Sequence, residues 1–291
     1  RGHEVTVLTG IPNYPEGKIY ADYRNRQNRR ETIEGVTVFR SYTIPRGKNT
    51  LHRILNYFSF AISSSIGVLL GQYKAKDGSE FDCVFVNQSS PVMMAWAGMA
   101  YKNKYKKPLF LYCMDVWPDS LTVGGVKQDS LIFKLFKFIS KKVYRASDYI
   151  FVTSPSFKNH FVNQFDITEQ KITYLPQYAE DLFIPDESIV NKESVDLTFA
   201  GNIGKAQNLE TILKAASLIE KNTDLPKKIH FHFVGDGTEL LSMKALAHEL
   251  ELKNVSFYGR RSLEEMPTFY KKSDAMLVSL IGDSIVSRTI P

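Results

Sequence analysis

Residues 197–209 contain the pattern in this chain with the clearest chemical meaning. A β-prone run ends at Ala200, a helical pattern begins near Asn208, and between them lie Gly201, Asn202, Ile203, Gly204 and Lys205. A strand, a glycine turn and a helix N-terminus together present free backbone N–H groups and the positive end of a helix dipole, which suits a phosphate. The glycines let the backbone approach the anion, and Lys205 adds a cation on the same loop. An ordinary strand-to-helix turn is the alternative interpretation.

Motif spacing argues against several other classes of enzyme. The 201–205 loop lacks the spacing of a P-loop and the Ser or Thr that follows its lysine. Gly235-Asp236-Gly237 continues to Leu240 at a position where a dinucleotide-binding fingerprint requires glycine. The sequence has no zinc-protease signature and no Gly-x-Ser-x-Gly segment. P-loop NTPases, nicotinamide dehydrogenases and two classes of hydrolase are therefore disfavoured.

Composition indicates a globular protein. The chain has 291 residues, 43% of them hydrophobic, and this length is typical of about two domains. Its two cysteines, Cys83 and Cys113, lie in apolar strand-like runs, so we expect buried thiols in a reducing compartment, without a disulfide or zinc site. The six histidines show no ligand spacing, so no metal site is predicted. The longest apolar stretch, residues 54–70, is interrupted by one Asn and four Ser, which argues against a membrane-spanning helix.

Strands and helices alternate along the whole chain. The first half predicts strands at 4–9, 36–40, 83–86, 109–112, 149–152 and 172–175, with long helices over 51–73 and 130–145. The second half predicts strands at 197–200, 229–234, 255–258 and 275–280, separated by helices over 209–220 and 240–250 and one from 263. This alternation is typical of βαβ units and parallel sheets. We therefore predict an α/β protein with two Rossmann-like domains, residues 1–180 and 196–291, joined by a linker over 181–195. Both ends look truncated.

The motifs, in this order, resemble those of glycosyltransferase family 4, which has the GT-B fold. The second half carries Gly-Asn-x-Gly, Val-Gly-Asp-Gly and Val-Ser-Phe-Tyr-Gly-Arg, followed by Ser-x-x-Glu-Met-Pro-x-x-Tyr. In the first half, Gly-His-Glu-Val-Thr-Val-Leu-Thr, Asn-Tyr-Pro and Asp-Val-Trp-Pro resemble a narrower subgroup of bacterial O-antigen and capsule transferases, which includes fucosamine transferases. The resemblance extends along nearly the whole chain.

The resemblance implies a nucleotide-sugar donor bound mainly by the second half and an acceptor bound mainly by the first. It implies a retaining reaction without an obligatory metal or other cofactor. Glutamates eight positions apart, which hold the donor in the family, do not occur before Pro291. The donor-binding residues implied by position are Gly201, Asn202, Gly204, Lys205, Gly235, Gly259 and Arg260, although a solvated turn is the favoured interpretation of the arginine side chain.

Two loops of the first half would serve the acceptor and the reacting sugar. Asn13 and Tyr14 would line the acceptor site, and a structural turn is the alternative for both. Asp115 follows a predicted strand, where parallel sheets bind ligands, and it stands where many family members carry a histidine. We interpret it as the catalytic residue, hydrogen-bonded to hydroxyls of donor or acceptor; a helix N-cap is the alternative.

Positive charge is concentrated in the first half of the chain. Residues 1–180 carry 24 Lys and Arg against 15 Asp and Glu, whereas residues 181–291 carry 13 against 16. The helix predicted over 130–145 places Lys134, Lys137, Lys141, Lys142 and Arg145 in one sector and Phe133, Leu135, Phe136, Ile139 and Val143 opposite. Such a helix can lie on an anionic membrane or pack on the sheet with a solvated basic face. Nucleic acid is disfavoured, because no binding module is recognised.

These observations favour a retaining glycosyltransferase. It would move a sugar from a UDP-sugar to a polyprenol-linked glycan in surface polysaccharide biosynthesis. We expect a cytoplasmic protein, peripheral on the inner face of the bacterial membrane. A nucleotide-sugar 2-epimerase of similar shape and a non-catalytic nucleotide-sugar-binding subunit are the alternatives.

Overall fold

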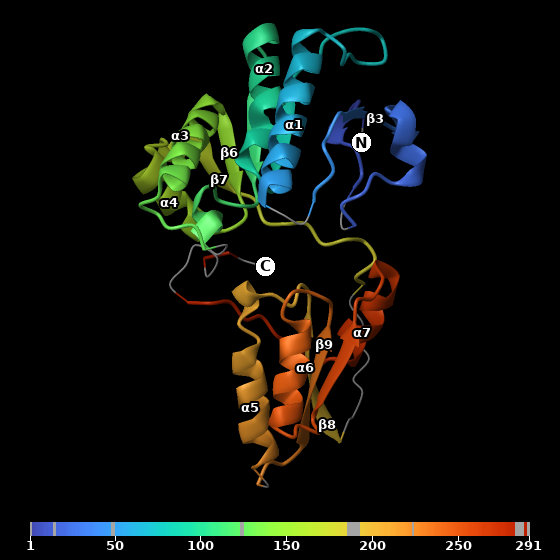
Figure 1. The fold of residues 1–291 in the computed structure, drawn as a ribbon, viewed down its shortest axis with the longest axis vertical. Coiled ribbons are helices and arrows are strands. Elements are labelled where there is room, and N and C mark those ends of the chain that lie inside the picture. The colour runs from blue at the N-terminus through green and yellow to red at the C-terminus, as the bar shows by residue number, and fades with distance from the viewer. Residues whose placement is uncertain are drawn as a thin grey trace. The chain divides into compact units, whose positions relative to one another are not determined.

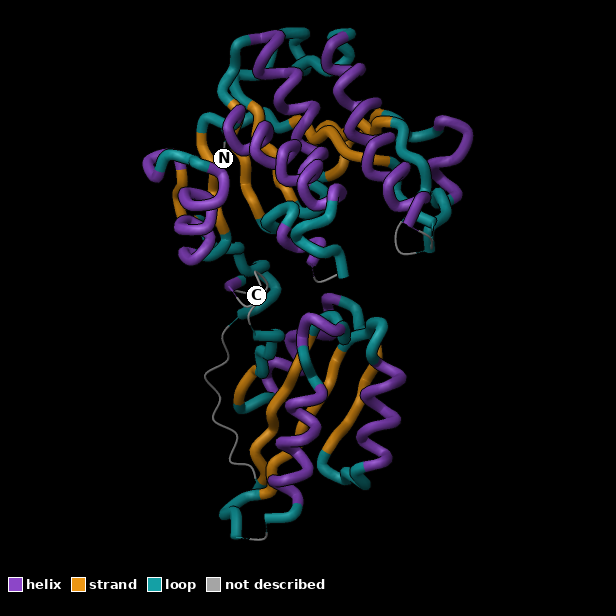
Figure 2. Tube along the Cα trace, turned by 60° about the vertical axis from the view of Figure 1, so that its left-hand side comes forward, coloured by secondary structure: helices purple, strands orange, loops and turns teal. Residues whose placement is uncertain are grey.

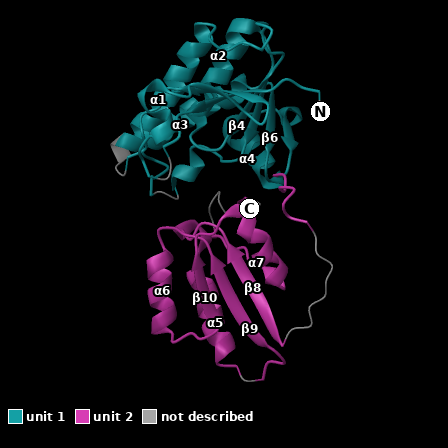
Figure 3. Cartoon of the chain, turned by 90° about the vertical axis from the view of Figure 1, so that its right-hand side faces the viewer, with its two compact units in different colours: residues 1–176, 290 teal, residues 177–289, 291 magenta. Residues whose placement is uncertain are grey.

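The computed structural model of the chain describes residues 2–13, 16–47, 50–122, 125–184, 193–222, 224–282 and 288–289. It divides into two compact units, which Figure 3 colours separately. Unit 1 spans residues 1–176, and unit 2 spans residues 177–289. Residues 185–192 of the predicted linker lie outside the described residues.

Unit 1 holds a small mixed sheet and a larger parallel one. In the first, β1 (Thr6–Gly10) pairs in parallel with β3 (Val36–Ser41), and β2 (Arg30–Ile33) pairs antiparallel with β3. The second is parallel in the order β4–β5–β6–β7, with bounds Val84–Gln88, Leu109–Cys113, Tyr149–Val152 and Ile172–Tyr174. Helices connect the strands, and α1 and α2 lie side by side (Figure 1). The helices are α1 (Thr50–Leu69), α2 (Trp96–Tyr105), α3 (Leu131–Ala146) and α4 (Pro155–Phe165).

An aromatic cluster joins α3 to α4 in the core of unit 1. The Tyr144 ring of α3 lies 4.6 Å from the Phe161 ring and 4.8 Å from the Phe165 ring, measured between centroids, and all three side chains are fully buried. Ser130 is the N-cap of helix α3, and its Oγ accepts a hydrogen bond from the Phe133 N–H at 3.2 Å. This packing fixes the two helices that follow β5 and β6.

Unit 2 is a four-stranded parallel sheet in the order β10–β9–β8–β11. The strands are β8 (Ser194–Ala200), β9 (Lys228–Val234), β10 (Val255–Gly259) and β11 (Ala275–Met276), and the helices are α5 (Glu210–Glu220), α6 (Leu240–Glu249) and α7 (Met266–Lys272). Phe231 and Phe233 project from β9 into a core with Leu213 of α5 and Met243 of α6. On the opposite face, the ring of Tyr258 contacts that of Phe269 in α7. Figure 2 shows the helices alongside the strands of this unit.

The predicted class, α/β with two repeated halves and parallel sheets, is confirmed. The observed bounds of some elements differ from the predicted ones, because a helix ends where its last carbonyl groups can be capped. The helix expected to reach residue 73 ends at Leu69, with Gly71 in the left-handed region at φ +72° and its N–H donating to the Val68 carbonyl. Strand β2 and helix α4 were not predicted. The 3-10 turns lie at Ala21–Arg26, Val92–Ala95, Asp119–Thr122, Glu169–Lys171, Lys205–Gln207 and Leu263–Glu265.

One expectation about the thiols is wrong. Cys113 is buried as predicted, but Cys83 is exposed, because it precedes β4 and lies in the connection that leads into the strand. Both are free thiols. The apolar run that follows Cys83 misled the prediction, since strand-like composition does not mark the exact residue at which the strand begins.

We predict that Phe161→Ala lowers the free energy of unfolding of unit 1 by about 3–5 kcal/mol, because it leaves a cavity among fully buried rings. Denaturant unfolding followed by tryptophan fluorescence measures this directly, since both tryptophans, Trp96 and Trp117, belong to unit 1. The matched control is Leu131→Ala, at a side chain that is 84% exposed, which should change the free energy by less than about 0.5 kcal/mol. Equal effects of the two variants would contradict the prediction.

Candidate active site

Three loops meet at one edge of the sheet in unit 2. Strands β8, β9 and β10 are parallel, so the loops that follow them lie at the same edge. Gly201 N–H donates to the Val234 carbonyl at 2.9 Å, and Ile203 N–H donates to the Asp236 carbonyl at 2.9 Å. Gly235 N–H in turn donates to the Gly259 carbonyl at 2.9 Å. The three glycine motifs found in the sequence therefore form one interlocked backbone structure.

Glycine is required at Gly235 because another backbone occupies the space of a side chain. A Cβ at this position would lie 1.8 Å from the Gly201 carbonyl oxygen, and the residue has φ +140°. Gly237 is similar, since its Cβ would lie 2.3 Å from the Ile203 carbonyl oxygen. Sequence reasoning placed Gly235 among the donor-binding residues. Its evident role in the structure is to let the second loop approach the first.

The loop of residues 201–208 offers unused hydrogen-bond donors. Among the described residues, the N–H groups of Gly204, Lys205 and Ala206 have no acceptor. The Lys205 side chain is exposed and forms no ion pair within the described part of the chain. Helix α5 begins at Glu210, later than predicted, because a 3-10 turn over Lys205–Gln207 and a left-handed Asn208 precede it. Three free amides and one ammonium group on a tight turn are suited to an anion.

The remaining predicted donor residues lie at the same edge. Asn202 is exposed within the first loop, and Arg260 is exposed immediately after β10. Gly259 has φ +70° and accepts the hydrogen bond from Gly235. Arg261 contacts Glu265 at 3.5 Å, so the neighbouring arginine belongs to the turn.

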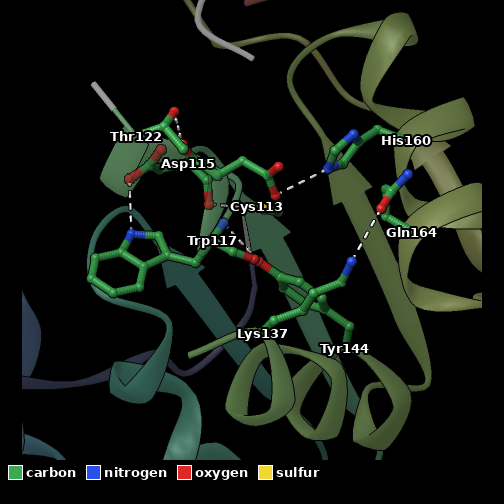
Figure 4. Close-up of polar contacts among 9 residues, drawn as sticks. Cys113, Asp115, Trp117, Thr122, Lys137, Tyr144, His160 and Gln164 are labelled. Atoms are coloured by element: carbon green, nitrogen blue, oxygen red, sulfur yellow. Dashed lines mark hydrogen bonds and ion pairs between the residues drawn. The ribbon is translucent and has the colours of Figure 1, made fainter. Parts of the chain in front are cut away.

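Asp115 in unit 1 lies just after β5, in a cradle of side chains (Figure 4). Its Oδ2 accepts a hydrogen bond from Trp117 Nε1 at 3.0 Å, and Trp117 Nε1 also lies 3.1 Å from Ser90 Oγ. Its main-chain carbonyl accepts from Gln88 Nε2 at 2.9 Å. These contacts come from Trp117 in the same loop and from Gln88 at the end of β4, and they differ from the helix N-cap considered as the alternative.

Burial controls the ionisation of Asp115. Removal from water raises the pKa of this carboxyl from 3.8 to about 6, whereas hydrogen bonds from Trp117, Ser120 and Ser90 act in the opposite direction. Both protonation states are therefore accessible near neutral pH. The carboxyl can accept a hydrogen bond from a ligand hydroxyl when ionised and can donate one when protonated.

The loop that carries Asp115 is held by two residues that the sequence analysis missed. Tyr144 is fully buried, and its hydroxyl accepts from the Trp117 N–H and donates to the Trp117 carbonyl, both at 3.0 Å. His160 Nε2 of α4 lies 3.2 Å from Asp119 Oδ2 in the same loop (Figure 4). No local motif marks these residues, because they come from helices 25 and more positions away and are brought to the loop only by packing.

A cavity of about 360 Å³ lies at the carboxyl ends of β1 and β3, against α1. Asn13, a predicted acceptor-binding residue, lines it. Both ends of its amide are engaged, because Nδ2 donates to the Ile11 carbonyl at 2.7 Å and Oδ1 accepts from the Arg46 N–H at 2.8 Å. Asn13 thus shapes the cavity wall by joining two loops. Tyr14 lies outside the described residues.

The cavity adjoins Asp115 through shared side chains. Ser90 lines the cavity and also contacts Trp117. Tyr57 lines it as well, and its ring centroid lies 6.3 Å from that of Trp117. A ligand in the cavity would therefore lie next to the Asp115 loop.

Neither unit brings together a metal site among its described residues, where groups of three or more His, Cys, Asp or Glu side chains in ligating positions are absent. His232 lies between Asp196 and Tyr258, at 2.8 Å and 2.9 Å, on the face of the unit 2 sheet opposite Phe233. This arrangement is a hydrogen-bond network within the sheet, as expected for a packed histidine.

None of the described helices is both long and apolar enough to cross a bilayer.

Two α/β units with parallel sheets are the architecture of glycosyltransferases of the GT-B class. The family model described as Glycosyltransferase Family 4 matches residues 1–177, and the model of Glycosyl transferases group 1 matches residues 182–282. The chain therefore belongs to glycosyltransferase family 4.

The relatives agree with this assignment. The chain is 26% identical to WcaI of Escherichia coli K12, named as a colanic acid biosynthesis glycosyl transferase, over 96% of this chain and 69% of that protein. Its fold is similar to that of WaaG, a glycosyltransferase involved in lipopolysaccharide biosynthesis (TM-score 0.59, 12% identity, 95% of this chain and 75% of that one). Its fold is also similar to that of the pneumococcal O-GlcNAc transferase GtfA, whose structure was solved with UDP and GlcNAc. The TM-score is 0.51 and the identity 11%, and the match covers 86% of this chain and 49% of that one.

We predict a pH-dependent contribution of Asp115 to stability. Its folded-state pKa of about 6 lies above the ordinary 3.8, so the folded state holds the proton more tightly than the unfolded chain does. The stabilisation from protonation is therefore complete below about pH 4 and is lost as the pH rises through about 6, by up to about 3 kcal/mol in total. The measurement is the free energy of unfolding of wild type minus that of Asp115→Asn, determined from about pH 4 to about pH 7.5. A difference that stays constant across this range would contradict the prediction.

Proposed function

We propose that this chain transfers a sugar, with retention, from a UDP-sugar to a lipid-linked glycan in the assembly of a bacterial surface polysaccharide. The observation that carries the proposal is the interlocked loop structure of unit 2, with the free amides of Gly204, Lys205 and Ala206 beside an exposed lysine. The GtfA structure, which contains UDP and GlcNAc, supports the choice of donor. The names of WcaI and WaaG support the type of product.

The proposed reaction needs stabilisation of negative charge on the leaving group. The bond between C1 of the donor sugar and the β-phosphate oxygen breaks, and its electron pair departs with UDP. The acceptor hydroxyl oxygen forms the new bond to C1 on the same face, and its proton passes to the departing phosphate. Amides fixed by the loop interlock, together with Lys205, stabilise that charge without reorganisation. We assign no role to a metal.

Asp115 is proposed to orient a hydroxyl of the donor or acceptor sugar. Its carboxyl is mostly buried, with a pKa of about 6 because of that burial. A hydroxyl that binds there would gain a strong hydrogen bond in a site with little competing water. The contacts of Trp117 with Tyr144 hold the loop in place, so the carboxyl is already oriented before a ligand arrives.

Helix α3 is proposed to bind an anionic membrane surface. Leu131, Leu135 and Phe138 are 84%, 55% and 58% exposed, at helical spacing along one stripe. Lys142 Nζ lies 4.4 Å from the Phe138 ring centroid, and Lys134 is exposed beside the stripe. Apolar side chains flanked by lysines are typical of helices that lie on anionic lipid.

The sequence placed Leu135 in the sector opposite the basic residues, but its side chain is 55% exposed in the structure. Leu135 faces solvent because Phe133 and Val143 fill the contact with the core of unit 1. Lys141 and Arg145 pair with Asp166 at 2.6 Å and 3.1 Å. The positive charge available for lipid is therefore carried by Lys134, Lys137 and Lys142, since Lys137 Nζ lies 3.2 Å from the neutral Gln164 Oε1.

We predict that Lys205→Ala weakens UDP binding by about 1–3 kcal/mol, the range for a charge-assisted hydrogen bond. Isothermal titration calorimetry with UDP, with AMP as the specificity control, measures the change in the protein as its gene encodes it. Lys221→Ala, at an exposed lysine just after α5, is the matched control and should bind like wild type. Unchanged affinity in the Lys205 variant would remove this side chain from the donor site.

Assays of UDP release and of the sugar product, on the same protein preparation, distinguish between the alternative functions. Release of UDP that requires a lipid-linked acceptor supports the transferase. UDP release with an altered free sugar and no acceptor would instead indicate a 2-epimerase. UDP binding with no turnover, tested across acceptors, would indicate a binding subunit.

We predict that vesicle binding requires anionic lipid and that the double variant Lys134→Gln/Lys142→Gln weakens it by about 1 kcal/mol per lysine. Sedimentation with phosphatidylglycerol-containing and pure phosphatidylcholine vesicles, at low and high salt, provides the measurement. The control is Lys221→Gln/Lys228→Gln, at two exposed lysines of unit 2. Equal partitioning onto neutral vesicles would exclude the electrostatic mechanism.

A further inference from the structure

Three hydrogen-bonded side chains, those of Asp196, His232 and Tyr258, join three adjacent strands of the unit 2 sheet. His232 Nε2 on β9 lies 2.8 Å from Asp196 Oδ1 on β8, and its Nδ1 lies 2.9 Å from the Tyr258 hydroxyl oxygen on β10. An ionised carboxylate only accepts hydrogen bonds, so Nε2 carries a proton, and Nδ1 of the neutral ring accepts from the Tyr258 O–H. Both ring nitrogens are thus used to connect the strands.

Tyr258 occupies an irregular position in its strand. Phe257 pairs with Phe233, whereas Gly259 pairs with Val234. One extra residue, Tyr258, is therefore inserted in β10 between residues that pair with two consecutive positions of β9. Such an insertion leaves the extra residue without a partner in the ladder and bends the strand. The hydrogen bond from the tyrosine hydroxyl to β9 supplies a side-chain anchor at the point where the backbone pairing is irregular.

The loop that follows β10 begins directly after this irregularity. Gly259 has φ +70°, and its carbonyl accepts the hydrogen bond from the Gly235 N–H that links this loop to the one after β9. At the other end of the loop, the Ser262 N–H donates to Glu265 Oε2 at 2.9 Å within a capping box. The exposed part of the loop therefore lies between two anchors, Tyr258 on one side and Ser262 on the other.

Two nearby features allow the hydrogen bonds to be tested separately from packing. The Tyr258 ring meets that of Phe269 in α7 edge-on, at 5.1 Å between centroids, and this contact does not need the hydroxyl. His230 lies two residues before His232 on the same face of β9, with its ring centroid 6.5 Å from that of His232. Within the described part of the chain, His230 forms no hydrogen bond to β10.

We propose that His232 and Tyr258 are positioning residues for the nucleotide site. Held by Asp196, they fix the irregularity in β10 and thereby the loop that presents Gly259 and Arg260. They act through the backbone, without touching the ligand. The effect on nucleotide binding rests on the proposed glycosyltransferase function, in which Gly259 and Arg260 belong to the donor site. The effect on the loop itself does not depend on that function.

Digestion of the folded protein with trypsin tests the anchor directly, because the loop contains Arg260 and Arg261, and trypsin cleaves after arginine. Tyr258→Phe should speed cleavage at these two positions by about three- to tenfold, the factor that corresponds to the loss of one hydrogen bond. The protein is used as its gene encodes it, and mass spectrometry identifies each cleaved bond. Cleavage after Lys221 and Lys253, two exposed lysines of unit 2, is the internal reference and should keep its rate.

Variants of His232 test whether the hydrogen bonds act as one chain. His232→Leu should speed cleavage of the loop at least as much as Tyr258→Phe. His232→Gln should restore much of the wild-type rate, because its amide can donate to Asp196 and accept from Tyr258. The double variant His232→Leu/Tyr258→Phe should not exceed the larger single effect, since both changes break the same chain. His230→Leu is the matched control and should be cleaved like wild type.

Calorimetric titration of the same variants with UDP connects the anchor to the donor site. Tyr258→Phe and His232→Leu should weaken UDP binding by about three- to tenfold, and His230→Leu should bind like wild type.

Several results would overturn the proposal. They are an unchanged rate of loop cleavage in Tyr258→Phe, an equal increase at the reference lysines, additive effects in the double variant, and unchanged UDP affinity in variants whose loop is cleaved faster. A wild-type protein that binds no UDP would count against the proposed function instead, and the cleavage rates would still decide whether His232 and Tyr258 hold the loop.

Discussion

The backbone contact between the loops after β8 and β9 is the constraint on which the donor side of this protein depends. Gly201 donates to the carbonyl of Val234 at the end of β9, and Ile203 donates to that of Asp236 in the following loop. Gly235 donates in turn to the carbonyl of Gly259 at the end of β10. Main-chain groups used in this way are fixed by the sheet and cannot reorient independently. The amides of Gly204, Lys205 and Ala206 have no acceptor among the described residues, and the proposed anion site rests on these groups.

In unit 1 the candidate site residues are held in place by side-chain hydrogen bonds, whereas in unit 2 the loops are held by backbone hydrogen bonds. Asp115 accepts a hydrogen bond from the indole N–H of Trp117, and the main chain of Trp117 is in turn held by the buried hydroxyl of Tyr144. The cavity beside it is shaped by Asn13, which satisfies one loop with its amide nitrogen and another with its oxygen. The catalytic candidate and the acceptor candidate therefore share a rigid support, which suits positioning of a hydroxyl.

The sequence was informative where function depends on order along the chain. Alternating strands and helices predicted the α/β units, and the segment from Leu197 to Lys205 predicted a strand followed by a turn before a helix, because strand, turn and helix signals are local. The reason for Gly235 could not be predicted, since it lies in a carbonyl of another loop. Tyr144 and His160 were missed for the same reason. The predicted burial of two single residues was also wrong. Cys83 is exposed because it precedes its strand, and Leu135 is exposed because it lies at the margin of a helix face that other side chains already fill.

Because of the contact at Gly235, the presence of glycine at this position in a sequence gives information on the fold and none on the substrate. The obstacle to a larger residue is a main-chain oxygen, which every amino acid possesses, so no substitution at a neighbouring position can make room. The need for glycine at this position is consequently set by the architecture of the two loops. The Val-Gly-Asp-Gly motif is thus a signature of the fold, and the information that distinguishes one substrate from another must be encoded in side chains elsewhere in the molecule.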